Sequence, residues 1–163
     1  MAVSPSERSR VPSWATREKL RRMLREYTVA DYLERLGYLG EARDRICLST
    51  DFIVGFPGED EAAFEELKGF VKEARFDHVG VFTYSPEEGT TAHGLGDPIP
   101  RRTKEARKRR ILELQQKIAR ERNQEKVGQV IDVLVEGAHE ETDLIVKGRH
   151  QGQAPDIDGN VLL

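Results

Sequence analysis

The stretch that decides the fold is Ser49-Thr50-Asp51-Phe52-Ile53-Val54-Gly55-Phe56-Pro57-Gly58-Glu59. It is an apolar run that ends in a turn containing glycine and proline. A second segment of the same kind follows at Val81-Phe82-Thr83-Tyr84-Ser85-Pro86-Glu87-Glu88-Gly89-Thr90. Each segment predicts a buried strand that continues into a polar loop. In parallel α/β proteins this junction, at the carboxyl end of the strand, is where ligands bind.

The segment between the two strands predicts a helix over residues 61–74. Acidic residues crowd its first turn, where the helix dipole favours negative charge. Phe64, Leu67 and Val71 then recur at helical spacing and define one apolar face. The strands, expected at residues 46–54 and 79–84, are too far apart in sequence for a hairpin. They therefore predict a parallel βαβ unit and an α/β fold class.

A loop and a long helix are expected next. Proline and glycine recur over residues 85–100 and oppose regular structure there. Thr103 is the expected N-cap of a helix that runs to about Val127. Two i,i+4 ion pairs, Glu105–Arg109 and Glu113–Lys117, are expected to support this helix.

The two ends of the chain differ from this centre. Residues 1–15 read as a disordered lead, and two helices follow it, the second capped by Thr28 and ending at Gly37 or Gly40. After Gly128 the period becomes strand-like at residues 131–136 and again at 144–147. Asp158-Gly159 indicates a hairpin turn before the last residues, 161–163. A small antiparallel barrel is predicted, with its third strand starting as the sequence ends.

Composition excludes several classes of protein. The 163 residues carry 26 Lys and Arg against 29 Asp and Glu, a net charge of −3, which argues against a globally basic nucleic-acid binder. A single cysteine, Cys47, excludes an intrachain disulfide framework. We expect it to be a buried, inert thiol in its strand rather than a metal ligand. No apolar run reaches the ~18 residues of a spanning helix, so we expect a cytoplasmic protein without a membrane partner.

The quoted segments resemble the late barrel strands of the radical S-adenosylmethionine methylthiotransferases. Residues 20–28 resemble the helix after the family's fourth strand, 76–90 its sixth strand and loop, 114–123 its linking helix, and 127 onward its TRAM domain. After the disordered lead (1–15), the resemblance implies three parts. They are the C-terminal part of a partial barrel (16–100), a linking helix (101–127) and a partial TRAM barrel (128–163).

The resemblance also implies a site. The family binds S-adenosylmethionine and two [4Fe–4S] clusters, and the matching residues of the cofactor pocket here are Thr50, Asp51, Ile53, Gly55 and Phe56. The residues expected to face the substrate are Tyr84, Ser85, Glu87 and Glu88. Read without the resemblance, Gly55 and Pro57 also fit a simple strand-to-helix turn. No catalytic or metal-binding residue is expected, because three thiolates are needed to hold such a cluster and the chain has one. We expect no stable cofactor binding by this chain alone, and no activity.

Two features favour the RimO-type branch of the family, which modifies ribosomal proteins. The pair Glu87-Glu88 stands where tRNA-modifying relatives tend to carry arginine, and residues 153–159 resemble a signature of that branch. The implied reaction is β-methylthiolation of an aspartate in a small-subunit ribosomal protein. Acidic residues suit this basic partner, although they also fit solvated strand edges. They are Asp132, Glu136, Glu140, Glu141, Asp143, Asp156 and Asp158.

Two alternatives remain open. One is a part of a tRNA methylthiotransferase, and the other is a non-catalytic module that binds ribosomal protein or RNA. The basic run Arg101–Arg110 could contact RNA phosphates. Such a run is more often the solvated face of a long helix.

Overall fold

The computed structural model describes residues 46–154 and 159–163, together with Asp31, Glu34, Arg35 and Gly37. The chain divides into two compact units, residues 1–122 and 123–163. The expected disordered lead, most of the two N-terminal helices and the turn residue Asp158 lie outside the described residues. Within the described part, no helix is long and apolar enough to cross a membrane.

The first unit contains the predicted βαβ arrangement. Strand β1 (Ser49–Val54) pairs in parallel with β2 (His78–Thr83), and α3 (Glu61–Ala74) lies between them in sequence. Both the parallel pairing and the helix are confirmed. The predicted strand 46–54 is three residues too long at its start, because residues 46–48 are not in strand conformation.

Local chemistry explains where α3 begins and ends. Asp60 is the N-cap, and its Oδ1 accepts a hydrogen bond of 2.7 Å from the backbone N–H of Ala63. Arg75 closes the helix in a left-handed conformation, with φ of 47°, and its N–H donates to the carbonyl of Val71. Phe64 and Val71 are completely buried, and burying each side chain contributes roughly 1.5–3 kcal/mol.

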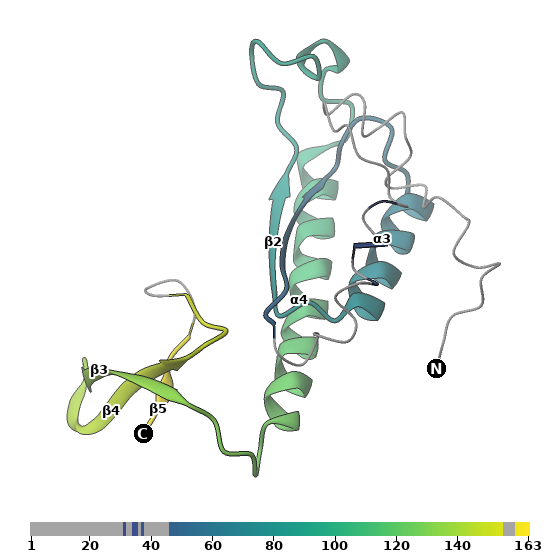
Figure 1. Ribbon diagram of the computed structural model, residues 1–163. Coiled ribbons are helices and arrows are strands. Elements are labelled where there is room, and N and C mark those ends of the chain that lie inside the picture. The colour runs from purple at the N-terminus through teal and green to yellow at the C-terminus, as the bar shows by residue number, and fades with distance from the viewer. Residues whose placement is uncertain (1–30, 32–33, 36, 38–45, 155–158) are drawn as a thin grey trace. The chain divides into compact units, whose positions relative to one another are not determined.

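Helix α4 (Arg101–Glu125) runs along the same strand pair, from its carboxyl ends, near Lys104, to its amino ends, near Arg122. Together α3 and α4 cover one face of the two strands, the face that carries Phe52, Val54 and Val81 (Figure 1). The core is completed by side chains of both helices and of the turn before β2. They are Phe64, Leu67, Val71, Phe76, Ile111 and Ile118.

The expectations for the start of α4 need correction. The helix begins at Arg101 rather than after Thr103, because Pro100 precedes it and the N–H of Thr103 already donates to the Pro100 carbonyl at 2.9 Å. The ion pair of Arg109 on the exposed face also differs from expectation. Arg109 lies 3.8 Å from Glu113, one turn toward the C-terminus, whereas the predicted partner, Glu105, is one turn toward the N-terminus. The loop before it contains one short 3₁₀ turn, η3 (His93–Leu95).

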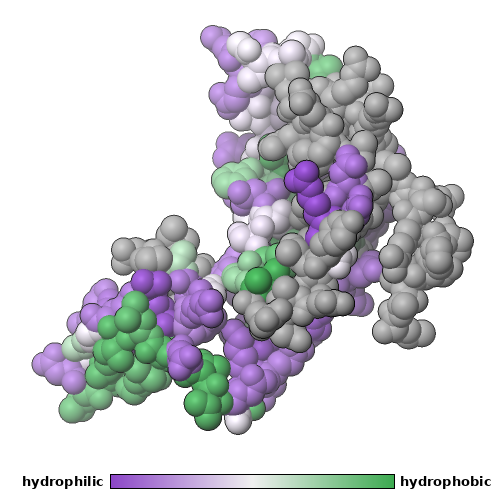
Figure 2. Space-filling view, in the orientation of Figure 1, coloured by the Kyte–Doolittle hydropathy of each residue, from purple (hydrophilic) through white to green (hydrophobic). Residues whose placement is uncertain are grey.

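The second unit is a three-stranded antiparallel sheet. Its strands are β3 (Val133–His139), β4 (Thr142–His150) and β5 (Val161–Leu162), in that spatial order. The predicted antiparallel character is confirmed, although β4 is longer than expected at both ends. Much apolar surface of this unit is exposed, as Figure 2 shows; Leu134 is 58% and Leu144 92% exposed.

Candidate functional site at the carboxyl ends of β1 and β2

Among the described residues, no helix covers the face of the strand pair opposite α3 and α4, which is called the open face below. Parallel register places Asp51 beside Gly80 and Ile53 beside Phe82, so these four residues share this face. Ile53 is 46% exposed and Phe82 57% exposed. Two apolar side chains and a carboxylate therefore line a surface that no described helix covers. Phe82 was missed at the level of sequence, although its alternation with Val81 in the strand could have placed it there.

Asp51 lies over a glycine that makes room for it. A Cβ atom at Gly80 would lie 2.0 Å from Oδ1 of Asp51, which is far inside van der Waals contact. Any side chain at residue 80 must therefore displace the Asp51 carboxylate. Gly80 is thus a packing partner of Asp51, which is itself a predicted cofactor-facing residue.

The turn after β1 has two glycines with positive φ, Gly55 at 78° and Gly58 at 89°, a region that side chains other than glycine rarely adopt. The N–H of Gly55 donates to Oε1 of Glu59 at 3.0 Å. Phe56 is 4% exposed and packs edge-to-face on Tyr84, with ring centroids 5.1 Å apart.

The predicted site residues are therefore not equivalent. Asp51 and Ile53 are exposed on the open face, whereas Thr50 is half-buried in register with Val79, on the side that the helices cover. Phe56 and Tyr84, with 4% and 7% exposure, support the turn and the loop from within. Ser85, Glu87 and Glu88 are exposed.

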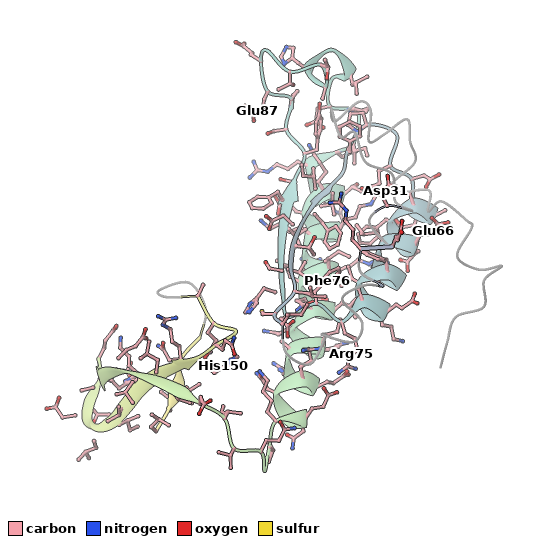
Figure 3. The ribbon with its side chains drawn as sticks, in the orientation of Figure 1. Asp31, Glu66, Arg75, Phe76, Glu87 and His150 are labelled. Carbon is pink, nitrogen blue, oxygen red and sulfur yellow. The ribbon has the colours of Figure 1, made fainter. Side chains whose placement is uncertain are left out.

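The loop after β2 has its own local bonds. The Ser85 hydroxyl donates to Oε1 of Glu87 at 2.7 Å, and the Thr90 hydroxyl donates to the Glu87 carbonyl at 2.8 Å. The Tyr84 hydroxyl donates to the Ala92 carbonyl at 2.8 Å. Glu87 lies in this loop beyond the carboxyl end of β2, while Arg75 and Phe76 lie toward the opposite end of the strands (Figure 3).

Two buried cations of α4 were missed at the level of sequence. Lys104 is 4% exposed and Arg107 is 6% exposed. Lys104 Nζ contacts both carboxylate oxygens of Asp97, at 2.7 and 2.6 Å, and Arg107 lies 2.6 Å from Oε1 of Glu59. The signal was present in the spacing, since the buried positions of α4 recur every three or four residues. They are Lys104, Arg107, Ile111, Gln115 and Ile118.

The basic run is therefore not a continuous phosphate-binding surface. A third member, Arg110, contacts Glu61 at 2.7 Å and also Glu65. Arg110 holds the pKa of Glu61 below its usual value, and Lys68 together with Arg110 does the same for the pKa of Glu65. The same carboxylates raise the pKa of Arg110. The arginines left exposed in the run are Arg101, Arg102 and Arg109.

The C-terminal half of α4 contacts the amino ends of the two strands. Arg122 lies 2.8 Å from Oδ1 of Asp77, whose Oδ2 accepts from the N–H of Leu48 at 2.8 Å. The amide of Gln115 donates to the carbonyls of Phe76 and Asp77. Helix α4 thus holds both ends of the strand pair through polar contacts.

Cys47 corrects one expectation. It is exposed and precedes β1, so it is not the buried strand thiol that the apolar run predicts. Among the described residues, no group of three or more His, Cys, Asp or Glu side chains is placed to hold a metal ion. The donor set of this chain does not fit a [4Fe–4S] cluster, which requires several thiolates. The exposed face offers one carboxylate and two apolar side chains, which are kinds of group that line ligand sites.

Comparison with known proteins shows what this chain is similar to. Residues 127–163 match the TRAM domain family. The chain is 49% identical to the ribosomal protein uS12 methylthiotransferase RimO of Myxococcus xanthus over 130 residues, 78% of this chain and 27% of that protein. It is 54% identical to RimO of Aquifex aeolicus over 112 residues, 69% of this chain and 26% of that protein. Over most of its length this chain is similar to part of a RimO methylthiotransferase.

A third relative extends the match. RimO of Bdellovibrio bacteriovorus is 46% identical over 144 residues, which is 88% of this chain and 32% of the relative. The chain thus spans about a quarter to a third of the length of the RimO proteins it matches. Together with the TRAM match at its end, this supports a C-terminal part of RimO, as the sequence motifs predict.

Proposed function

We propose that this chain forms part of the cofactor wall and of the substrate loop in an enzyme that methylthiolates ribosomal protein uS12. The observation that carries the proposal is the open face of β1 and β2, where Asp51, Ile53 and Phe82 are exposed. At the carboxyl ends of the same strands lie a glycine turn and an acidic loop. Parallel sheets bind their ligands at this edge.

Each exposed group has a chemical role in the proposal. The Asp51 carboxylate would accept hydrogen bonds from a hydroxyl pair or an ammonium group of S-adenosylmethionine, and Ile53 and Phe82 would pack on its apolar parts. Gly55 permits close approach of the backbone. When bound, S-adenosylmethionine would supply the methyl group and, beside an iron–sulfur cluster, the means of hydrogen abstraction, and the second cluster of the full enzyme would supply the sulfur atom. The thiolates for that cluster must come from outside this chain, because Cys47 is its single cysteine.

The loop after β2 suits a basic protein substrate. Glu87 and Glu88 are exposed at the loop, and their charge attracts the Lys- and Arg-rich surface of a ribosomal protein. We place the target aspartate of uS12 next to this loop, in the cytoplasm where ribosomes assemble. The acidic residues of the TRAM part contribute less to this attraction than their number suggests. Glu136 pairs with Arg149 at 2.6 Å, and Glu140 pairs with Lys147 at 3.3 Å.

A chimera tests the proposal. The matching segment of the Aquifex aeolicus protein is replaced by this chain, the clusters are reconstituted anaerobically, and uS12 is supplied with S-adenosylmethionine and a reductant. Mass spectrometry is expected to find one methylthio group on one aspartate of uS12. An Asp51→Asn chimera is expected to keep its clusters and its fold but to bind S-adenosylmethionine more weakly. A chimera that loads its clusters and binds S-adenosylmethionine yet leaves uS12 unmodified refutes the proposal.

The second candidate is RNA binding, which the exposed Arg101, Arg102 and Arg109 favour. Three other cations of the same run are engaged by carboxylates, and this weighs against it. Paired titrations of the full chain with tRNA and with uS12 separate the two. Tighter binding of tRNA, abolished when these three exposed arginines become glutamine, would favour the tRNA-directed alternative. Tighter, salt-sensitive binding of uS12 supports the first proposal.

A further inference from the structure

Lys104 is a buried charged residue. It occupies the core-facing stripe of α4, and only 4% of its surface is exposed. A buried ammonium group is costly unless paired and fully hydrogen-bonded. The hydrogen-bond partners of the Lys104 ammonium group therefore show which parts of the chain it joins.

Lys104 Nζ has three acceptors within reach, one for each of its protons. It donates to the Tyr84 carbonyl at 2.7 Å and to the two carboxylate oxygens of Asp97 at 2.7 and 2.6 Å. Nζ also lies 5.8 Å from the centre of the Tyr84 ring, within range of a cation–π contact. Since all three protons are used inside the fold, this ammonium group is not available to bind RNA phosphate.

The stem of Lys104 reaches these acceptors across Gly55. A Cβ atom at Gly55 would lie 2.2 Å from Cγ and 2.5 Å from Cδ of Lys104. Because Gly55 has no side chain, the turn after β1 leaves room for the Lys104 side chain to extend from α4 to the end of β2. The same turn is part of the proposed cofactor wall, so the lysine lies between the two halves of the site.

The three acceptors lie at the two ends of one loop. Tyr84 is the first residue after β2, and Asp97 lies three residues before Pro100 and the start of α4. Between them are Ser85, Glu87 and Glu88, and the bonds described for Glu87 are local turns with Ser85 and Thr90. A single ammonium group therefore joins the entry and the exit of the loop to the helix.

We propose that Lys104 and Asp97 are positioning residues that close the 85–96 loop and hold its acidic side chains against the protein substrate. The inference rests on the proposed function for the identity of the substrate, but the closure of the loop does not. Lys104 touches no reacting atom in this scheme; it acts through Tyr84 and Asp97. The family resemblance alone assigns no role to either residue.

Amide hydrogen exchange on the full chain tests the closure. Lys104→Met keeps the length of the stem and removes the three bonds, and Lys117→Met is the matched control because Lys117 is exposed on the same helix. Exchange of the amides at 85–96 is expected to rise about tenfold or more in Lys104→Met, and to stay unchanged in Lys117→Met. Unchanged exchange in Lys104→Met overturns the inference. Asp97→Asn, which retains one acceptor, covers the case in which the methionine variant fails to fold and is expected to give a smaller rise.

Kinetics of the chimera test the positioning role. Lys104→Met and Asp97→Asn are each expected to raise KM for uS12 by about tenfold, with kcat at saturating uS12 and binding of S-adenosylmethionine little changed. Lys104→Arg, which restores the charge, is expected to recover part of the loss. If amide exchange in the 85–96 loop rises while KM for uS12 stays unchanged, the positioning role is refuted. If the unaltered chimera fails to modify uS12, the proposed function falls, while the exchange experiment still decides whether the loop is closed.

Discussion

At the scale of single residues, one carboxylate oxygen organises the turn after β1. Oε1 of Glu59 accepts from Arg107 at 2.6 Å and from the N–H of Gly55 at 3.0 Å. Both side chains of the ion pair are 7% exposed. A buried ion pair as a whole adds little to stability. Removing one member of the pair is nevertheless costly, because the other charge stays buried. Glu59 and Arg107 are thus expected to be strongly coupled.

A double-mutant cycle measures this coupling. Arg107→Met is expected to lower the free energy of unfolding by about 3 kcal/mol, because the Glu59 carboxylate stays buried and loses its ion pair with Arg107. Adding Glu59→Gln is expected to recover a large part of that loss, since the amide is neutral and its oxygen still accepts from Gly55. Urea unfolding of the four proteins gives the result, and additive effects would contradict it. Arg109→Met, at an exposed position, is the control and is expected to change stability by less than about 0.5 kcal/mol.

The ion pairs of Arg110 predict how the stability of the protein depends on pH. Arg110 hydrogen-bonds Glu61, whose folded-state pKa is thereby lowered from 4.5, and it also contributes to the lowered pKa of Glu65. A carboxyl group whose pKa is lower in the folded state stabilises the protein at pH values above its unfolded-state pKa. This contribution is lost as the pH falls through the folded-state pKa. The difference in stability between wild type and Arg110→Met is therefore expected at neutral pH and should vanish in acid. Urea unfolding across this range measures it, and a difference that grows in acid would contradict the assignment.

At the scale of elements, sequence patterns predicted what depends on apolar periodicity. Phe64, Leu67 and Val71 marked the buried face of α3 because an amphipathic stripe is local information. Lys104 and Arg107 follow the same spacing, but charged side chains are ordinarily solvated, and their partners, Asp97 and Glu59, lie outside the helix, where helical periodicity does not reveal them. Cys47 was misplaced because an apolar run does not mark where strand pairing begins.

The glycines of β2 and α3 provide a matched pair for an element-scale prediction. Gly80→Ala is expected to destabilise the strand pair by about 1–3 kcal/mol, because the new Cβ would lie 2.0 Å from Oδ1 of Asp51. Gly69→Ala, in the middle of α3 with nothing within 4 Å of its new Cβ, is expected to stabilise the chain by up to about 1 kcal/mol. Thermal unfolding distinguishes the two signs. In the chimera, Gly80→Ala should also weaken S-adenosylmethionine binding, whereas Gly69→Ala should not.

At the scale of the whole molecule, the two units differ in how much apolar surface they bury. The first unit has a continuous core of buried aromatic and aliphatic side chains. In the second, among the residues described there, Gly148 alone is buried, and Leu134, Val135 and Leu144 are all more than half exposed. Burial of apolar surface is the main favourable term in folding. The stability of the chain is therefore expected to reside in the first unit.

Leucine truncation in each unit tests this distribution. Leu67→Ala, at a site 2% exposed in α3, is expected to cost about 2–5 kcal/mol of unfolding free energy. Leu144→Ala, at a site 92% exposed in β4, is expected to change it by less than about 0.5 kcal/mol. Hydrogen exchange should agree, with amides of β1 and β2 protected at least about tenfold more than those of β3 and β4. Equal protection in both sheets, together with a large cost for Leu144→Ala, would mean that the second unit has a core of its own.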